Sequence, residues 1–130
     1  MLHTDIRIAL IPGRPAAVAI RLREQSVGTV FLSAITVAEL AFGAEKSSRP
    51  TENRRALDQF LFSFIVVPFD TAATVAYGRL RAALERRGTP IGPFDYLIAA
   101  HALSLGHTLV TANEREFGRI AELAIENWNG

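Results

Sequence analysis

The sequence predicts an α/β protein in which a mainly parallel sheet is covered by helices on both faces. Short apolar runs such as Ile65–Val67 and Thr108–Val110 alternate along the chain with longer segments of helical character. This alternation is typical of parallel sheets, because each crossover places a helix on one face of the sheet. The chain is 49% hydrophobic, which is enough to build a core from 130 residues. No repeat or long linker divides the chain, so we predict a single domain over residues 1–130.

The first part of the chain contains two predicted strands and two predicted helices. Over residues 2–10, apolar side chains and Thr4 share every second position, which indicates a strand. A helix follows over residues 13–23, with a proline near its start. Residues 29–32 form a short β-branched and aromatic strand, and residues 33–44 form a second helix.

The middle of the chain is predicted from its proline, aspartate and glycine signals. Pro50 precedes a helix that ends near Phe64, and the buried strand Ile65–Val67 follows. Asp70 is a suitable N-cap for a long helix over residues 71–87. Gly88 fits the C-terminal cap of that helix.

The last part of the chain is predicted to hold one helix and two strands. Pro93 fits the first turn of a helix that Gly106 closes. Residues 108–110 then form a strand, and residues 123–126 add an edge strand.

Charge and composition exclude several classes of function. The formal net charge is only +1, so any nucleic-acid binding must depend on local arginine clusters. The absence of cysteine excludes disulfides, thiolate zinc sites and a cysteine nucleophile. The apolar runs are much shorter than the ~20 residues that span a membrane. Asp5 and Arg7 interrupt the apolar region that a signal peptide would need. We therefore expect a soluble cytoplasmic protein.

Glu39 and Asp95 are the first candidates for a chemical role. Asp95 lies in the first turn of its helix, where the helix dipole favours a carboxylate by about 0.3–1 kcal/mol without any function. Glu39 fits a capping box that starts at Thr36, but Ser33 is an earlier cap that would place Glu39 inside the helix. Carboxylates at strand ends and helix starts converge on one crevice of an open α/β sheet, and they repel unless a cation lies between them.

A second group of polar residues follows the strand at residues 108–110. Asn113 and Glu116 could line the same crevice, or Thr111 and Asn113 could simply cap a short helix. His101 and His107 are not spaced as a ligand pair, and we interpret them as a helix-face and a solvent-edge histidine. Most arginines are expected on solvated faces, although some near the crevice could bind phosphates.

Several short motifs occur in a fixed order along the chain. They are Met1-Leu2-x-Thr4, Ser33-Ala34-Ile35-Thr36-x-x-Glu39-Leu40, Gly43-Ala44-Glu45-Lys46-Ser47, Arg87-Gly88-Thr89-Pro90-Ile91-Gly92-Pro93-x-Asp95, Leu97-Ile98-Ala99-x-His101-Ala102, Leu109-Val110-Thr111-x-Asn113-x-Arg115-Glu116-Phe117 and Glu126-Asn127-Trp128. Together they resemble the PIN-domain ribonuclease toxins of the VapC type, from bacterial toxin–antitoxin pairs. Each motif alone is weak, but the whole series is specific and runs nearly end to end.

The resemblance implies a three-layer α/β/α PIN fold and Mg²⁺- or Mn²⁺-dependent cleavage of RNA. By position, Glu39 and Asp95 match metal-site acids of the family, and Asn113 and Glu116 match the acid and amide positions of its last motif. Pocket-lining hydroxyls of the family correspond to Thr4 and Thr111. The resemblance also implies initiator tRNA as a substrate, a VapB-type antitoxin as partner, and a homodimer that joins larger complexes with the antitoxin.

The first strand departs from the family pattern. His3 stands where the family carries a central metal-binding aspartate, and Asp5 stands where it usually carries asparagine. A neutral imidazole removes negative charge and suits Mn²⁺ or Zn²⁺ better than Mg²⁺. Asp5 is a further candidate metal ligand on the same face of the strand. It lies about 6.6 Å further along, which is too far for it to replace the aspartate directly unless the strand end shifts.

Two main hypotheses follow from this departure. In the first, the chain is a VapC-type endoribonuclease that His3 impairs, with Glu39, Asp95 and Glu116 at the metal and with His3 as a weak ligand or base. In the second, it is a catalytically silent module that binds its antitoxin, dimerises and supports operon repression. A PIN-like DNA nuclease is a third hypothesis, which faster cleavage of single-stranded DNA than of RNA would support.

Overall fold

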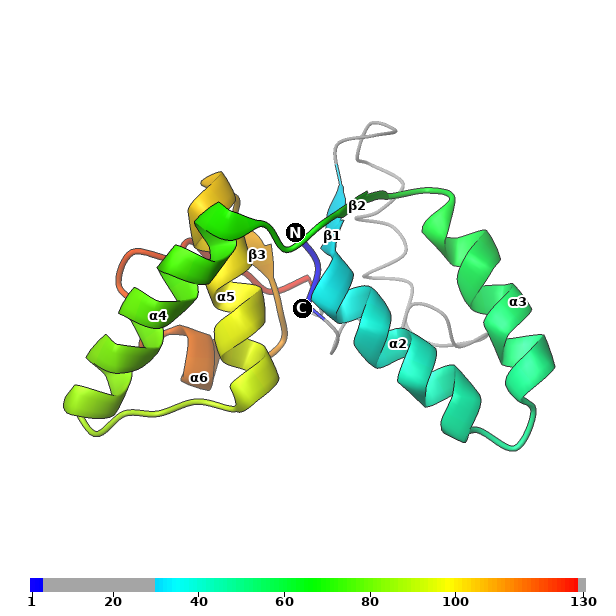
Figure 1. The fold of residues 1–130 in the computed structure, drawn as a ribbon, viewed down its shortest axis with the longest axis horizontal. Coiled ribbons are helices and arrows are strands. Elements are labelled where there is room, and N and C mark those ends of the chain that lie inside the picture. Colours follow the sequence, from blue (N-terminus) through cyan, green and yellow to red (C-terminus); the bar gives the residue numbers. More distant parts are fainter. Residues whose placement is uncertain (4–29, 129–130) are drawn as a thin grey trace.

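The computed structural model describes residues 1–3 and 30–128. The described residues form short strands and longer helices that alternate along the chain (Figure 1). In chain order these are β1 (Phe31–Ser33), α2 (Ala34–Lys46), α3 (Pro50–Leu61), β2 (Ile65–Val67), α4 (Thr71–Arg86), α5 (Pro93–Leu105), β3 (Leu109–Val110), α6 (Glu114–Phe117) and β4 (Ile125–Glu126). The predicted helix over residues 13–23 and most of the first predicted strand, including Thr4 and Asp5, lie outside the described residues.

The described strands are parallel, as predicted. β1 pairs with β2, so that Phe31 lies opposite Ile65, and β3 pairs with β4. Residues 1–3 lie between these pairs. The Leu2 N–H donates to the Phe31 carbonyl at 3.0 Å, and Leu2 forms a parallel bridge with Val110. Residue 3 is thereby placed in the middle of the sheet.

Helices lie on both sides of these strands, which gives the three-layer α/β/α arrangement of the predicted fold class. Figure 1 shows α4, α5 and α6 on one side and α2 and α3 on the other. One buried cluster, which includes Leu84, Tyr96, Ile98 and Phe117, packs under α4 and α5. A second cluster around Leu2, Leu32, Val110 and Trp128 packs towards α2 and α3.

The predicted caps explain where most helices begin and end. The Ser33 hydroxyl accepts from the Ile35 N–H at 3.0 Å and caps α2, and an Asp70 carboxylate oxygen accepts from the Ala73 N–H at 3.1 Å and caps α4. Gly106 closes α5 in the left-handed conformation, at φ +69°. These signals were predicted correctly because they depend on contacts within one helical turn.

Several predicted boundaries were wrong. β1 includes Ser33, which also caps the next helix. α2 continues to Lys46, because the cap lies at Ser47, whose hydroxyl donates to the Ala44 carbonyl at 2.6 Å. α3 ends at Leu61 rather than near Phe64. The chain turns there so that Phe64 packs against the Leu2 and Leu32 cluster while Phe62 remains 88% exposed.

His101 lies on a face of α5, as interpreted from the sequence, and the structure shows that this position is fully buried beside Ser33. Its Nδ1 lies 2.7 Å from the Ser33 hydroxyl, which satisfies one of the ring nitrogens. Ala73 and Leu80 on α4 are likewise buried in the core.

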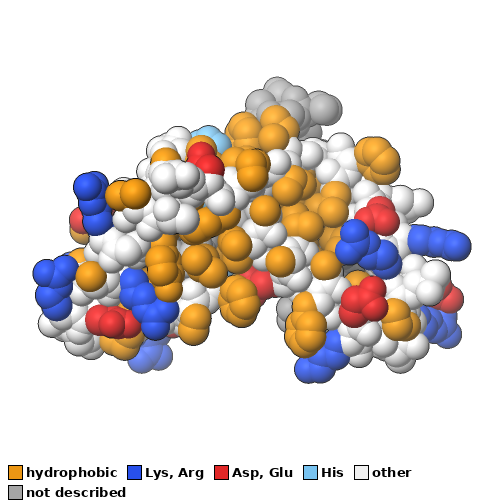
Figure 2. Space-filling model, in the orientation of Figure 1, with side chains coloured by type: hydrophobic (Ala, Val, Ile, Leu, Met, Phe, Trp, Pro, Cys, Tyr) orange, Lys and Arg blue, Asp and Glu red, His pale blue; other side chains and the backbone are white. Residues whose placement is uncertain are grey.

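Large hydrophobic side chains remain exposed on the surface. Phe42 on α2 is 67% exposed and Phe94 on α5 is 54% exposed. Figure 2 shows hydrophobic side chains gathered over α4, α5 and α2. It also shows a notch at the lower edge of the molecule, between the group of α4, α5 and α6 and the group of α2 and α3. Among residues 1–3 and 30–128, no helix is both long and apolar enough to span a membrane.

Candidate functional site

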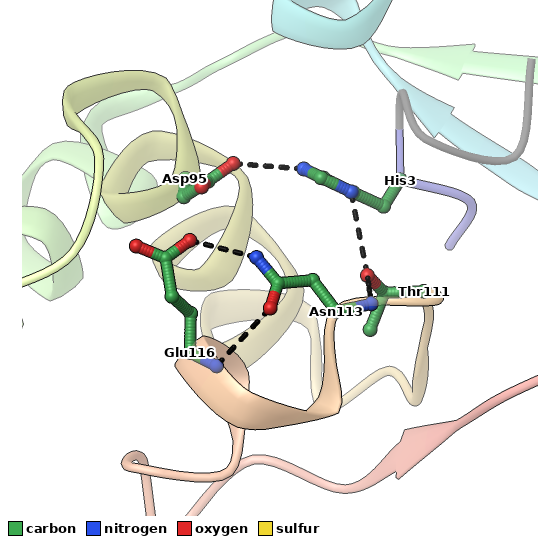
Figure 3. A network of polar contacts seen from close by, with 5 residues as sticks. All are labelled: His3, Asp95, Thr111, Asn113 and Glu116. Carbon is green, nitrogen blue, oxygen red and sulfur yellow. Dashed lines mark hydrogen bonds and ion pairs between the residues drawn. The ribbon is translucent and has the colours of Figure 1, made fainter.

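The candidate site lies where the parallel strands end. His3 follows the Leu2 bridge, Thr111 follows β3, and Asp95 lies in the first turn of α5. The carboxyl ends of parallel strands meet at one edge of a sheet. Figure 3 shows that the side chains of His3, Asp95, Asn113 and Glu116 face a common space at this edge. The convergence expected from the sequence is therefore present for these residues.

His3 contacts Asp95 directly. The Nε2 atom of His3 lies 2.8 Å from Asp95 Oδ1, and the side chains are only 9% and 20% exposed. On the other side of the ring, His3 Nδ1 lies 3.4 Å from the Thr111 hydroxyl oxygen. A carboxylate has no proton to give, so Nε2 is the donor to Asp95. The edge of the His3 ring also packs against Phe117, with ring centroids 4.9 Å apart.

Asp95 is placed by the start of α5. Pro93 occupies the first turn, where a missing N–H costs nothing, and Gly92 is the N-cap. A Cβ atom on Gly92 would lie 3.2 Å from Asp95 Oδ2, although the Gly92 φ of −61° is an ordinary value. A side chain at position 92 would therefore require the Asp95 carboxylate to shift by a few tenths of an ångström. Sequence reasoning did not single out Gly92, although the Gly-Pro-x-Asp pattern carried the signal.

Asn113 and Glu116 form the other half of the site. Asn113 Oδ1 accepts from the Glu116 N–H at 3.2 Å and caps α6, and Asn113 Nδ2 donates to Glu116 Oε2 at 2.7 Å. The Asn113 N–H in turn donates to the Thr111 hydroxyl at 3.0 Å. The capping interpretation is therefore correct for Asn113, whereas Thr111 bonds the residue before the helix. The Asn113 amide also fixes the Glu116 carboxylate. One local motif therefore has both roles.

Glu39 lies on α2, which packs mainly against α3 and also contacts α5. The capping box at Thr36 is excluded, because Ser33 is the N-cap and Glu39 lies well inside the helix. Glu39 is half-buried there. Its role at the metal, like that of Asp5, stays a prediction.

The donor set around Asp95 fits a hard cation in part. Asp95 and Glu116 present carboxylate oxygens from two separate elements to the same space (Figure 3). Mg²⁺ is commonly held by one or two carboxylates together with water and substrate phosphates. Within the part of the chain that the structure describes, however, no three His, Asp or Glu side chains form a group that could hold a metal ion. His3 also takes one oxygen of Asp95. The residues therefore fit a weak oxygen site.

Several arginines pair with acids on the helix surfaces, away from Asp95 and Glu116, as expected for solvated faces. Arg81 donates to Glu85 at 2.9 Å along α4. Other pairs form within α3 and at its start. Arg87 and Arg119 differ, because their guanidinium groups donate to backbone carbonyls of other segments.

Comparison with known families and relatives agrees with this architecture. The profile of the family described as PIN domain matches residues 1–123. The tRNA(fMet)-specific endonuclease VapC of Shigella flexneri is 42% identical over 99% of this chain and 97% of that protein. The protein of the same name from Salmonella typhimurium is 41% identical over 98% of this chain and 96% of its own length.

Solved structures give the same result. A chain of the DNA-bound VapBC structure from Salmonella typhimurium superposes with a TM-score of 0.92 and 41% identity, covering 98% of this chain and 96% of that one. A chain of VapBC2 from Rickettsia felis, bound to a promoter DNA fragment, gives a TM-score of 0.88 and 37% identity, with 99% and 98% coverage. Fold, site geometry and near full-length identity agree, and the chain belongs to the PIN-domain family, within its VapC group.

Proposed function

We propose that this chain is a VapC-type toxin whose site hydrolyses RNA phosphodiesters with a divalent metal ion, and that His3 impairs this activity. The observation that carries the proposal is the convergence of Asp95, Asn113 and Glu116 from separate segments at one sheet edge, with His3 bonded to Asp95. Relatives that match nearly the whole chain are named as tRNA(fMet)-specific endonucleases, which supports the reaction class.

Asp95 and Glu116 would hold the ion, which we take to be Mg²⁺ with Mn²⁺ as a substitute, and the resemblance adds Glu39. When bound, such an ion stabilises charge on the phosphate and makes a bound water more acidic. Asn113 keeps the Glu116 carboxylate in a fixed orientation through its 2.7 Å bond. Gly92 leaves room for the Asp95 carboxylate at the start of α5. Asn113 and Gly92 thus affect the positions of the Glu116 and Asp95 carboxylates, each through a contact within a short segment of the chain.

His3 would weaken the site in two ways. Its ring replaces a carboxylate, so the site loses an oxygen ligand and negative charge. Its Nε2 also bonds Asp95 Oδ1 at 2.8 Å, so an ion that binds this oxygen must first displace the imidazole. Because imidazole is a better ligand for Mn²⁺ than for Mg²⁺, the remaining activity should favour Mn²⁺.

Initiator tRNA is the substrate that we propose. Its support is that the Shigella and Salmonella relatives, which are 42% and 41% identical to this chain, are named as tRNA(fMet)-specific endonucleases. Elongator tRNA of similar size is the appropriate comparison, because both offer the same backbone charge.

The alternative function is an antitoxin-binding module with little or no catalysis. The His3–Asp95 contact favours it, because it occupies an acid that catalysis would use. The solved relatives include VapBC complexes, and the related FitAB has been solved bound to a DNA fragment. Exposed Phe42 and Phe94 and the notch in Figure 2 give a partner apolar surface to cover. A VapB-type antitoxin would bind here, and homodimers would assemble into larger complexes that repress their operon.

The test is a cleavage assay on initiator tRNA, in Mg²⁺, in Mn²⁺ and with a chelator. It compares this chain with His3→Asp, and with His3→Asp combined with Asp95→Asn as the inactive control. We expect chelator-sensitive cutting by His3→Asp that exceeds that of this chain by roughly 10- to 100-fold. Equal cutting by both would contradict impairment by His3. Cutting by His3→Asp with none by this chain would support the silent binding module for this chain. Absence of cutting by both would contradict the proposed reaction.

A further inference from the structure

The two backbone segments next to Asp95 and Glu116 are joined by hydrogen bonds from two arginines. The loop of residues 88–92 leads into α5 and Asp95, and the turn of residues 118–120 follows α6 and Glu116. Arg119 Nη1 donates to the Pro90 carbonyl at 2.7 Å, which joins the turn to the loop across 29 positions of sequence. This hydrogen bond therefore links the loop that leads to Asp95 directly to the turn that follows Glu116.

A second link runs in the opposite direction. Arg87, which caps the C-terminus of α4 just before the loop, donates from Nη2 to the Arg119 carbonyl at 3.3 Å. The loop side thus supplies one guanidinium and one carbonyl, and so does the turn side. Reciprocal bonds of this kind restrict sliding of one segment past the other more than a single bond does.

The loop is fixed at both of its ends, so the link can reach Asp95. Thr89 N–H donates to the Leu84 carbonyl at 2.9 Å, and Ile91 N–H donates to the buried hydroxyl of Tyr96 at 3.2 Å. Tyr96 follows Asp95, and its own N–H donates to the Gly92 carbonyl at 3.0 Å. A shift at Pro90 would therefore move the first turn of α5.

The turn after α6 is equally well fixed. Arg119 N–H donates to the Glu116 carbonyl at 3.1 Å, and Gly118 N–H donates to the Glu114 carbonyl at 2.8 Å. A Cβ on Gly118 would lie 2.5 Å from that Glu114 carbonyl oxygen, so only glycine fits this tight turn without a shift of the backbone. The Arg119 backbone is thus bonded directly to the residue that carries the second carboxylate.

We propose that Arg119, assisted by Arg87, is a positioning residue that sets the separation of Asp95 from Glu116. It acts through the backbone and touches neither carboxylate in the contacts described above. The inference rests on the proposed function for its catalytic consequence, whereas its structural consequence holds without any reaction. A guanidinium suits this role because it is planar, always charged and directs several N–H donors at fixed angles.

The first experiment uses the metal-free chain and hydrogen exchange of backbone amides. Arg119→Met is compared with Arg86→Met, a matched control whose exposed guanidinium donates to the Ala82 carbonyl of its own helix. We expect Arg119→Met to speed exchange about three- to tenfold at residues 89–96 and 114–120, with α2 and α3 unchanged. Arg119→Lys should restore part of the protection, because an ammonium group can still donate to Pro90.

Either of two results would overturn the proposal. One is exchange in Arg119→Met that matches Arg86→Met at both segments. The other is a uniform increase over the whole chain, which would indicate a general loss of stability. Hydrogen exchange is measured without RNA, so this experiment tests the role of Arg119 even if the proposed ribonuclease function is wrong.

The second experiment measures kcat and KM separately in the His3→Asp background. Positioning predicts that Arg119→Met lowers kcat about tenfold with KM for RNA unchanged, because misplaced groups reduce catalysis rather than binding. A raised KM with unchanged kcat and a weaker salt dependence would instead show that Arg119 contacts RNA phosphate, and would overturn positioning. Absence of cleavage by His3→Asp itself contradicts the proposed function, and the exchange experiment alone then decides on Arg119.

Discussion

The two halves of the candidate site are built in different ways. Glu116 is held by Asn113, three positions earlier on the same short segment. Asp95 contacts His3, which lies 92 positions away in sequence and reaches the site only because the sheet brings residues 1–3 beside β3. One half therefore depends on a single helical turn, and the other depends on the whole fold.

This difference explains where activity can be altered with little effect on structure. A change in the Asn113 half alters both a helix cap and a carboxylate. A change at His3 leaves every cap in place and acts on the charge beside Asp95. The family pattern is broken at His3, in the half of the site where a substitution can change the chemistry without removing a helix cap.

The largest effect is expected from the long-range half. Asp95→Asn in the His3→Asp background should lower the rate of RNA cleavage by roughly a hundredfold or more, because the amide cannot supply the charge that an ion needs. The free energy of unfolding should change little, since Asn keeps the shape of Asp. Cleavage rates and a denaturant titration check both parts. Unchanged cleavage and unchanged metal affinity would remove Asp95 from the site.

The local half should show a smaller catalytic effect together with a loss of stability. Asn113→Ala removes the cap of α6, which costs about 1 kcal/mol, and releases the Glu116 carboxylate. We expect roughly a tenfold lower cleavage rate in the His3→Asp background. Asn113→Asp should retain the cap but repel Glu116, so it separates the two roles. If Asn113→Asp behaves like the parent in cleavage, orientation of Glu116 by the amide is not needed.

Gly92→Ala tests the space beside Asp95 without changing any charge. The added Cβ at 3.2 Å from Asp95 Oδ2 forces the carboxylate to shift by a few tenths of an ångström. We expect a severalfold weaker Mn²⁺ affinity by calorimetry, since ligand geometry tunes affinity. Gly43→Ala on α2 is the control, because no atom lies within 4 Å of its added Cβ. Gly43→Ala should leave affinity unchanged and stabilise the helix by about 0.5–1 kcal/mol. Equal affinity in both variants would show that Asp95 moves freely.

The smallest effect concerns pH and lies outside the site. Burial lowers the pKa of His101 from its ordinary value of 6.5, and the nearby Asp70 carboxylate opposes this only in part. The unfolded chain therefore binds more protons than the folded chain below about pH 6.5, and the free energy of unfolding falls as pH drops through that range. Thermal unfolding between pH 5 and pH 7.5 should show a weaker pH dependence for His101→Gln than for the parent. An identical slope would mean that His101 does not contribute.

Much of the fold was predictable because its signals are local. Ser33, Asp70 and Gly106 cap or close helices where the sequence placed them. The end of α3 was not predictable from local signals, because it depends on Phe64 reaching a core that also contains Leu2. Burial of His101 is a similar case, since its partner Ser33 lies 68 positions away.

The site was predictable in its residue types more than in its contacts. The sequence indicated Asp95, Asn113 and Glu116 at strand ends and helix starts, and the structure brings them together (Figure 3). The Gly-Pro-x-Asp pattern contains Gly92, but the closeness of this residue to the Asp95 carboxylate is visible only in the structure. The links through Arg119 were also hidden, because a guanidinium that donates to a distant carbonyl leaves no pattern in the chain.

The most direct test of the central claim is the affinity for a divalent ion, measured by calorimetry with Mn²⁺ and Mg²⁺ on this chain and on His3→Asp. If His3 occupies an acid that the metal needs, His3→Asp binds Mg²⁺ at least roughly tenfold more tightly, and the gain is smaller for Mn²⁺. The gain should disappear when Asp95→Asn is added. Equal Mg²⁺ affinity of this chain and His3→Asp would contradict the account, because the His3–Asp95 contact would then cost the site nothing.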